Sequence, residues 1–214
     1  MAIQVKICGL IRPDAVDAVL KHGAAYFGFV FHPASPRHLT SETAGALLER
    51  LTSERHKDTV AVTVNPDDVL LETILKLPFG YIQLHGNESP ARVLAIKARF
   101  GKPIIKAFSV SSAEDLDAAA LYQDTADMFL FDAKSTNPAM PGGTGTSFDW
   151  SLMRSLKTNK PWFLSGGISL ANMDEALEES GAKMLDLSSS LESSPGIKDV
   201  TKIVAFLDHA EAKR

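Results

Sequence analysis

The sequence is poor in cysteine and lacks any long apolar segment. Cys8 is the only cysteine among 214 residues, so the chain can form no internal disulfide. That usage is typical of a reducing compartment, and we expect a cytoplasmic protein. No apolar run approaches the ~20 residues of a membrane span, and no basic and then apolar leader precedes the first predicted strand. We therefore expect neither a secretory signal nor a membrane partner.

A strong excess of charge of either sign is also missing. The formal net charge is -4, with 22% charged and 45% hydrophobic residues. This balance gives no indication of a nucleic-acid partner. No set of histidines and carboxylates has the spacing of a metal site, so we expect no metal. The length and hydrophobic content suffice for one domain with a full core.

What the chain does have is a regular alternation of predicted strands and helices. Short apolar, β-prone runs alternate eight times with segments whose apolar residues recur at helical spacing. The expected strands cover residues 4–8, 26–31, 59–64, 81–85, 103–108, 128–132, 162–165 and 184–188. Eight such units predict an α/β fold, a single-domain (β/α)8 TIM barrel. A doubly wound open sheet is the alternative, but eight regular units and no GxGxxG after the first strand count against it.

The expected barrel spans residues 1–209, and a polar tail is expected at 210–214. Two helices are predicted to begin at capping boxes, one at Ser111 to Glu114 and one formed by Asn172 and Glu175.

The functional groups of such barrels lie at the carboxyl ends of the strands. Cys8 ends the first strand and Asp132 the sixth, nearly across the mouth from each other. A thiol and a carboxylate suit a base and an acid in proton transfer. The alternatives are that Cys8 is a small buried hydrophobe and that Asp132 is a helix N-cap or pairs with Lys134 or Lys106.

Three more polar residues at strand ends are candidates for substrate binding. They are Arg37 in the loop after the second strand, His85 after the fourth and Asp186 in the eighth. The alternative for His85 is a histidine whose ring is satisfied within the protein. We expect a small-molecule substrate to fill the space between these groups.

A phosphate site is predicted after the seventh and eighth strands, where such barrels commonly bind this group. Gly166-Gly167 permits a close backbone approach to an anion, and Ser188-Ser189 adds hydroxyl donors. The alternative for the two glycines is an ordinary tight turn. We assign Gly143 and Gly145 to the same site, in a loop that either covers the mouth or is an ordinary flexible loop.

Seven segments resemble one known family in the order in which they occur. They are KICGL (6–10), SPRHL (35–39), QLHGNE (83–88), LFD (130–132), GGTGTSFDW (142–150), LSGGI (164–168) and DLSSSLESSPGIKD (186–199). Together they resemble phosphoribosylanthranilate isomerase, a (β/α)8 barrel of tryptophan biosynthesis that uses no cofactor. One departure is Ser190, where the family commonly has glycine after the paired serines.

The resemblance implies a reaction and a role for three residues. The reaction is the Amadori rearrangement of N-(5'-phosphoribosyl)anthranilate, a phosphosugar, by a monomer or homodimer without cofactor. Cys8 would be the general base, Asp132 the general acid, and Arg37 the cation that binds the anthranilate carboxylate.

The residue types fit these roles independently of the resemblance. Burial beside Phe129 and Phe131 favours a protonated Asp132. Lys6, on the same strand face as Cys8, favours the thiolate. The planar guanidinium of Arg37 matches a carboxylate at two points.

Two rival functions stay open at this stage. One is another phosphosugar barrel, such as indoleglycerol-phosphate synthase or a histidine-pathway isomerase, which would place Lys/Glu or paired Asp groups at these strand ends. The other is a non-catalytic barrel that binds a phosphoribosyl ligand, against which the Cys8 and Asp132 pair argues.

Overall fold

The eight predicted strands form a closed parallel barrel in the computed structural model, which describes residues 3–134 and 148–213. The strands are β1 (Gln4–Cys8), β2 (Tyr26–Val30), β3 (Thr59–Thr63), β4 (Tyr81–Leu84), β5 (Ile104–Val110), β6 (Met128–Ala133), β7 (Trp162–Leu164) and β8 (Met184–Leu187). Pairing of β1 with β8 closes the ring, which excludes the open doubly wound sheet. The fold is therefore the expected single-domain α/β barrel.

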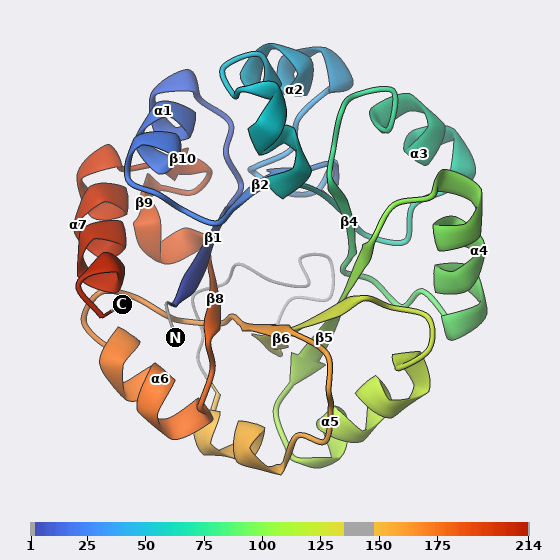
Figure 1. Cartoon of the computed structure of the whole chain (residues 1–214), viewed down its shortest axis with the longest axis vertical. Helices are drawn as coiled ribbons and strands as arrows, with labels where there is room; N and C mark the ends of the chain where they lie inside the picture. The colour runs from blue at the N-terminus through green and yellow to red at the C-terminus, as the bar shows by residue number, and fades with distance from the viewer. Residues whose placement is uncertain (1–2, 135–147, 214) are drawn as a thin grey trace.

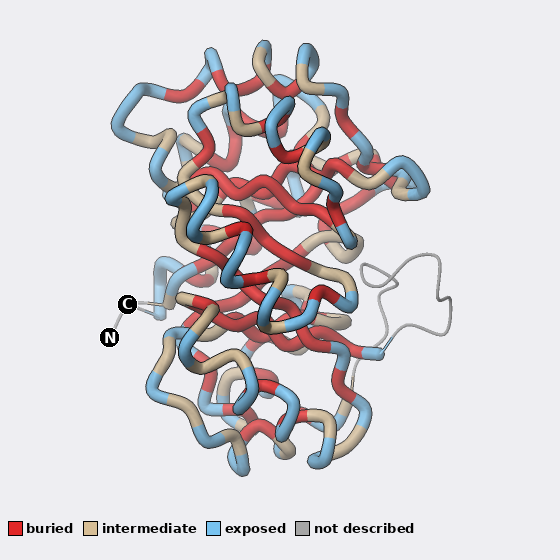
Figure 2. The backbone as a smooth tube through the Cα atoms, turned by 90° about the vertical axis from the view of Figure 1, so that its right-hand side faces the viewer, coloured by how far each residue is buried: buried red, intermediate tan, exposed pale blue. Residues whose placement is uncertain are grey.

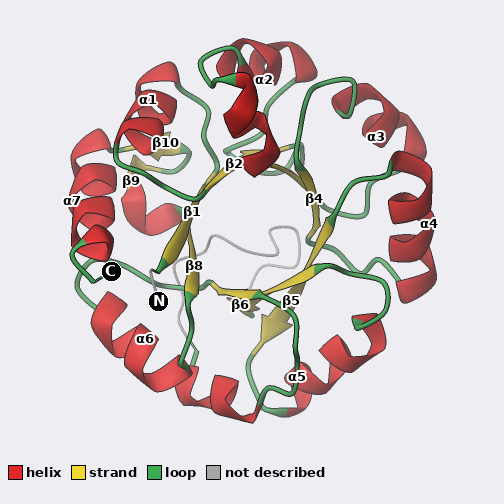
Figure 3. Cartoon of the chain, viewed as in Figure 1, coloured by secondary structure: helices red, strands yellow, loops and turns green. Residues whose placement is uncertain are grey.

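Helices surround the barrel, as Figures 1 and 3 show. They are α1 (Pro13–Lys21), α2 (Ser41–Leu48), α3 (Asp68–Ile74), α4 (Pro90–Phe100), α5 (Glu114–Asp117), α6 (Met173–Ser180) and α7 (Val200–Glu211). Short 3-10 helices are η1 (Ser53–Asp58), η2 (Ala118–Tyr122), η3 (Trp150–Ser155) and η4 (Ser189–Leu191). Within the described ranges, no helix is both long and apolar enough to cross a membrane.

Strand alternation divides the apolar residues into two cores. Val5 and Ile7 point outward and pack against the helices, whereas Lys6 and Cys8 point into the barrel. The outer core is a continuous layer between sheet and helices, and the inner one fills the barrel. Figure 2 accordingly shows buried backbone through the middle and exposed residues on the outside.

The structure corrects both predicted capping boxes. Ala113 is the N-cap of α5 and has no side-chain cap, because Asp115 accepts the backbone N–H groups of Ser111 and Ser112 at 2.8 and 3.1 Å. Only one α-helical turn forms there before η2 begins. Asn172 does precede α6, but its side chain accepts from the backbone N–H of Ser169 at 2.7 Å, not from the helix.

The last two elements also differ from expectation. A small antiparallel hairpin, β9 (Glu192–Ser194) with β10 (Ile197–Lys198), lies between β8 and α7 and was not predicted. Helix α7 extends through Glu211 and buries Ala210, so the boundary expected between residues 209 and 210 falls inside a helix.

Candidate active site

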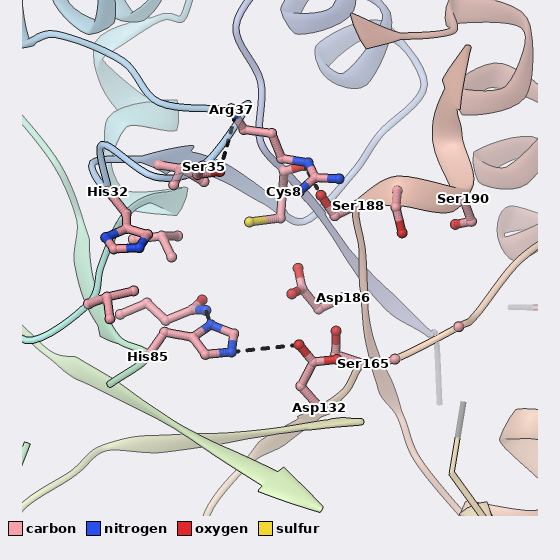
Figure 4. A pocket seen from close by; sticks show the side chains of 17 residues that line it. Cys8, His32, Ser35, Arg37, His85, Asp132, Ser165, Asp186, Ser188 and Ser190 are labelled. Atoms are coloured by element: carbon pink, nitrogen blue, oxygen red, sulfur yellow. Dashed lines mark hydrogen bonds and ion pairs between the residues drawn. The ribbon is translucent and has the colours of Figure 1, made fainter. Parts of the chain in front are cut away.

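One pocket at the carboxyl ends of the strands gathers most of the predicted functional residues (Figure 4). Its lining includes Cys8, Arg37, His85, Asp132, Gly166, Gly167, Asp186, Ser188 and Ser189. Gly143 and Gly145 lie outside the described residues. Groups from six loops or strand ends thus surround one space, as closure of the barrel requires.

Cys8 lies at the end of β1, and its sulfur points into this pocket. The residue is 7% exposed, so it has the burial of a core cysteine together with access to the cavity. Burial raises the pKa of the thiol, and the charges of Lys6 and Lys198 oppose that effect without cancelling it. The predicted help from Lys6 is therefore present but smaller than the cost of desolvation.

Lys6 is shared between the thiol and a carboxylate. Its Nζ donates to Asp186 Oδ1 at 2.8 Å, across the neighbouring strands β1 and β8, and its side chain is fully buried. Burial lowers the pKa of Lys6, but Asp186 and Cys8 outweigh burial and raise it, so the ammonium stays charged. Burial, together with the nearby Asp132, raises the pKa of Asp186 in spite of Lys6.

Asp132 lies inside β6 and faces the pocket, so it is not a helix N-cap. Its Oδ1 accepts the Ala133 N–H at 3.0 Å, and its Oδ2 lies 3.6 Å from His85 Nε2. Of the two lysines considered as partners of Asp132, Lys106 instead pairs with Glu88, with Nζ 3.0 Å from Oε2. Asp132 therefore keeps its carboxylate directed at the cavity (Figure 4).

The prediction that Phe129 and Phe131 bury Asp132 is wrong, because their side chains lie on the opposite face of the strand. Phe129 and Phe131 belong to the outer core, because they alternate with Leu130 and Asp132 along the strand. Asp132 is nevertheless only 4% exposed. Its burial comes from the walls of the pocket and not from the two phenylalanines.

His85 is held on one side and open on the other. Its Nδ1 lies 3.0 Å from Nε2 of Gln83, a fully buried side chain two residues earlier in β4. Its Nε2 faces Asp132 and has no hydrogen-bond partner within the described part of the chain. The histidine is thus half satisfied by the protein, which leaves one ring nitrogen for the pocket.

Arg37 is buried beside the pocket and is paired with a residue that the sequence did not suggest. Its Nε and Nη2 donate to Oε1 and Oε2 of Glu192 at 2.7 and 2.9 Å. Gly9 makes room for it: with φ +80, a Cβ there would lie 2.4 Å from Arg37 Cδ. The glycine of the KICGL segment is therefore required by Arg37 as well as by its own backbone conformation.

The two glycines of the predicted phosphate site have left-handed backbone conformations. Gly166 and Gly167 have φ values of +89 and +67, and Asn172 Nδ2 donates to the Gly167 carbonyl at 3.0 Å. The side chain that fails to cap α6 thus holds this turn in place. Ser190 adopts no strained conformation, because Asn65 is the only non-glycine residue with positive φ in the described ranges.

Several pocket residues were missed by sequence reasoning. They are His32, Ser35, Gln83, Ser165 and Ser190, which line the cavity, and Glu192 and Lys198, which support it. Gln83 and Ser165 share the alternation of the strands that carry His85 and Phe163, which was a usable signal. No group of three potential metal ligands is found among the residues that the structure describes.

Comparisons with known proteins agree with this geometry. The sequence profile described as N-(5'phosphoribosyl)anthranilate (PRA) isomerase matches residues 5–209. The N-(5'-phosphoribosyl)anthranilate isomerase of Paramagnetospirillum magneticum is 46% identical over the whole of both chains. That of Rhodospirillum centenum is 44% identical over 99% of this chain and 100% of its own.

Comparison with solved structures indicates the same family. The phosphoribosyl anthranilate isomerase of Thermus thermophilus superposes with a TM-score of 0.84 at 28% identity, covering 99% of this chain and 100% of that one. Another isomerase structure, in complex with reduced 1-(o-carboxyphenylamino)-1-deoxyribulose 5-phosphate, has a TM-score of 0.81 at 28% identity, covering 98% and 99%. The chain therefore belongs to the N-(5'-phosphoribosyl)anthranilate isomerase family, whose reaction yields 1-(2-carboxyphenylamino)-1-deoxyribulose 5-phosphate in tryptophan biosynthesis.

Proposed function

We propose that Cys8 is the general base and Asp132 the general acid of this isomerisation. The observation that carries the proposal is that the two side chains come from non-adjacent strands, β1 and β6, and face the same pocket (Figure 4). A substrate lying between them would have one group on each side. Neither of the rival barrels considered above calls for a thiol and a carboxylate in these places.

The acid acts first. A protonated Asp132 donates its proton to the ring oxygen of the ribose, the bond from that oxygen to C1' breaks, and the anthranilate nitrogen forms a C=N bond with C1'. His85 supports this step, because its Nε2 lies 3.6 Å from Asp132 Oδ2 and can donate to the carboxylate that the transfer leaves behind.

The base acts second. Cys8, as a thiolate, removes the proton from C2', and the electron pair of that C–H bond forms a C1'=C2' double bond while the C=N bond becomes a C–N single bond. The enol then gives up its hydroxyl proton as C1' gains one, which leaves the ketone. The steps balance without an external oxidant or reductant, in keeping with the proposal that no cofactor takes part.

The remaining pocket residues are proposed to bind the substrate. Arg37 pairs with the anthranilate carboxylate, and His85 and Asp186 contact the sugar between the two ends. A solved relative in complex with the reduced product supports a phosphosugar as the ligand. The enzyme is proposed to act in the cytoplasm, as a monomer or homodimer, without nucleic-acid or membrane partners.

The phosphate is proposed to bind the backbone N–H groups near Gly166, Gly167, Ser188 and Ser189. A branched side chain would obstruct the anion and is disfavoured at the φ of +67 that Gly167 adopts. We therefore expect inorganic phosphate to inhibit the enzyme competitively and Gly167→Val to abolish that inhibition, measured by steady-state kinetics. Unchanged inhibition in Gly167→Val would place the phosphate away from Gly167 and leave the roles of Cys8 and Asp132 intact.

A further inference from the structure

Glu192 belongs to the β9–β10 hairpin, which Figure 1 shows outside the ring of strands on the side of β1 and β8. Its carboxylate holds the guanidinium of Arg37 at two points, at 2.7 and 2.9 Å. Both residues are buried, at 6% and 8% exposure. A paired fork of this kind fixes the plane and direction of the guanidinium as well as its place.

The rest of the hairpin holds Glu192 in turn. Lys198, its cross-strand neighbour, donates to Oε1 at 2.5 Å, and the Gly196 N–H donates to Oε2 at 3.0 Å. Gly196 lies against the Arg37 loop, since a Cβ there would be 2.5 Å from the Pro36 carbonyl oxygen. The hairpin is therefore packed against the segment that carries Arg37 and is not a detached loop.

Arg37, Lys198 and Glu192 form a cluster with more positive than negative charge. Two cations, Arg37 and Lys198, share the single carboxylate of Glu192, so the three groups sum to a formal charge of +1. Lys198 Nζ also lies 3.4 Å from the Ser188 hydroxyl, which donates to the Cys8 carbonyl at 3.1 Å. The hairpin therefore contacts Arg37 directly and is linked through Lys198 to Ser188, which in turn bonds the backbone of Cys8.

We propose that Glu192 is a positioning residue that sets specificity for the aryl carboxylate of the substrate, by holding Arg37 through its Nε edge. A carboxylate that joins Arg37 without displacing Glu192 must then approach the edge formed by the two terminal nitrogens. Lys198 keeps Glu192 in place and preserves the positive charge of the cluster. This inference rests on the proposed role of Arg37 and extends it.

Glu192→Gln tests the proposal because the amide keeps the size but places an N–H group opposite a guanidinium or ammonium donor. We expect affinity for the reduced product to fall about tenfold and KM to rise similarly, with kcat at saturation largely retained. Inhibition by inorganic phosphate, proposed to bind at the other end, is the comparison and should change less than affinity for the reduced product, because Glu192 reaches that end only through Lys198 and Ser188. In an Arg37→Ala background, Glu192→Gln should have no further effect on affinity for the reduced product.

A gain in affinity for the reduced product would show that Glu192 has a different role. If Glu192 competes with the substrate for Arg37, Glu192→Gln will bind the reduced product more tightly, and the proposal is wrong. Unchanged affinity would overturn it as well.

A crystal of the wild-type enzyme with the reduced product tests the same point without a mutation. We expect Glu192 to remain within about 3.2 Å of Arg37 Nε while the ligand carboxylate contacts the terminal nitrogens. A ligand carboxylate on Arg37 in place of Glu192 would refute the positioning role alone. A carboxylate far from Arg37 would instead refute the proposed role of Arg37.

Discussion

The inside of the barrel changes character between the beginning and the end of the strands. At their beginnings most inward side chains are apolar or aromatic: Tyr26 packs edge-on against Tyr81 and Phe163, with ring centroids 5.7 and 5.2 Å apart. Burial, with a contribution from Tyr81, raises the pKa of Tyr26 to about 12, so no charge develops there near neutral pH. At the strand ends the inward positions carry Cys8, Asp132 and the other groups of the pocket.

Single strands show the same change at consecutive inward positions. In β6 the inward residues run Met128, Leu130, Asp132, and in β7 Phe163 is followed by Ser165 after the strand. The outward positions show no such gradient, because Phe129 and Phe131 face the same apolar layer. The difference teaches that position along a strand separates two kinds of inward residue: those near the beginning fill the barrel core, and those near the end carry the groups proposed for the chemistry.

Among the substitutions at the strand ends, Asp132→Asn should reduce activity the most. The amide keeps the shape of the side chain and removes the proton that is proposed to open the ribose ring. We expect kcat to fall roughly a thousandfold, within the range for loss of a general acid, with little change in affinity for the reduced product. Steady-state kinetics and a titration with the reduced product measure the two effects. A rise in KM with normal kcat would make Asp132 a binding residue and place the acid elsewhere.

Phe163→Ala is the matched change in the barrel core. Phe163 is fully buried inside the barrel, and truncating it leaves a cavity. We expect the free energy of unfolding to fall by about 3–5 kcal/mol, measured by urea denaturation, with kcat altered less than twofold or so in the folded enzyme. A large loss of kcat in folded Phe163→Ala would show that the two kinds of inward residue are not separate.

Arg37→Lys should have the smallest effect of the series. Lysine retains the charge but loses the planar fork that pairs with Glu192 and with a carboxylate. We expect about tenfold weaker binding of the reduced product and a kcat close to that of the wild type. Calorimetry can compare the two proteins, and equal affinities would exclude Arg37 as the carboxylate site.

The same comparison explains what could be predicted from the sequence. The strands were placed within two residues of their observed bounds because both of their faces are buried, which gives continuous apolar runs. The strand-end position then assigned Cys8 and Asp132 to one pocket, since closure brings all strand ends to one face.

What escaped prediction depends on contacts between distant parts of the chain. Glu192 pairs with Arg37 across 155 positions, and no local pattern indicates that pairing. The capping boxes failed for a related reason: Asp115 and Asn172 each had a competing backbone donor within reach, and local sequence does not determine which one wins.

The role of Cys8 is the central claim, and single-turnover fluorescence of the anthranilate-linked substrate tests it most directly. Burial raises the pKa of Cys8, so the thiolate fraction and the wild-type rate should still be increasing above the roughly pH 8.5 at which a free thiol is half ionised. Cys8→Ser should be at least about a hundredfold slower, since an alcohol ionises far above neutral pH, while binding the reduced product normally. A serine variant with a near-normal rate and an unaltered pH profile would contradict the assignment of Cys8 as the base.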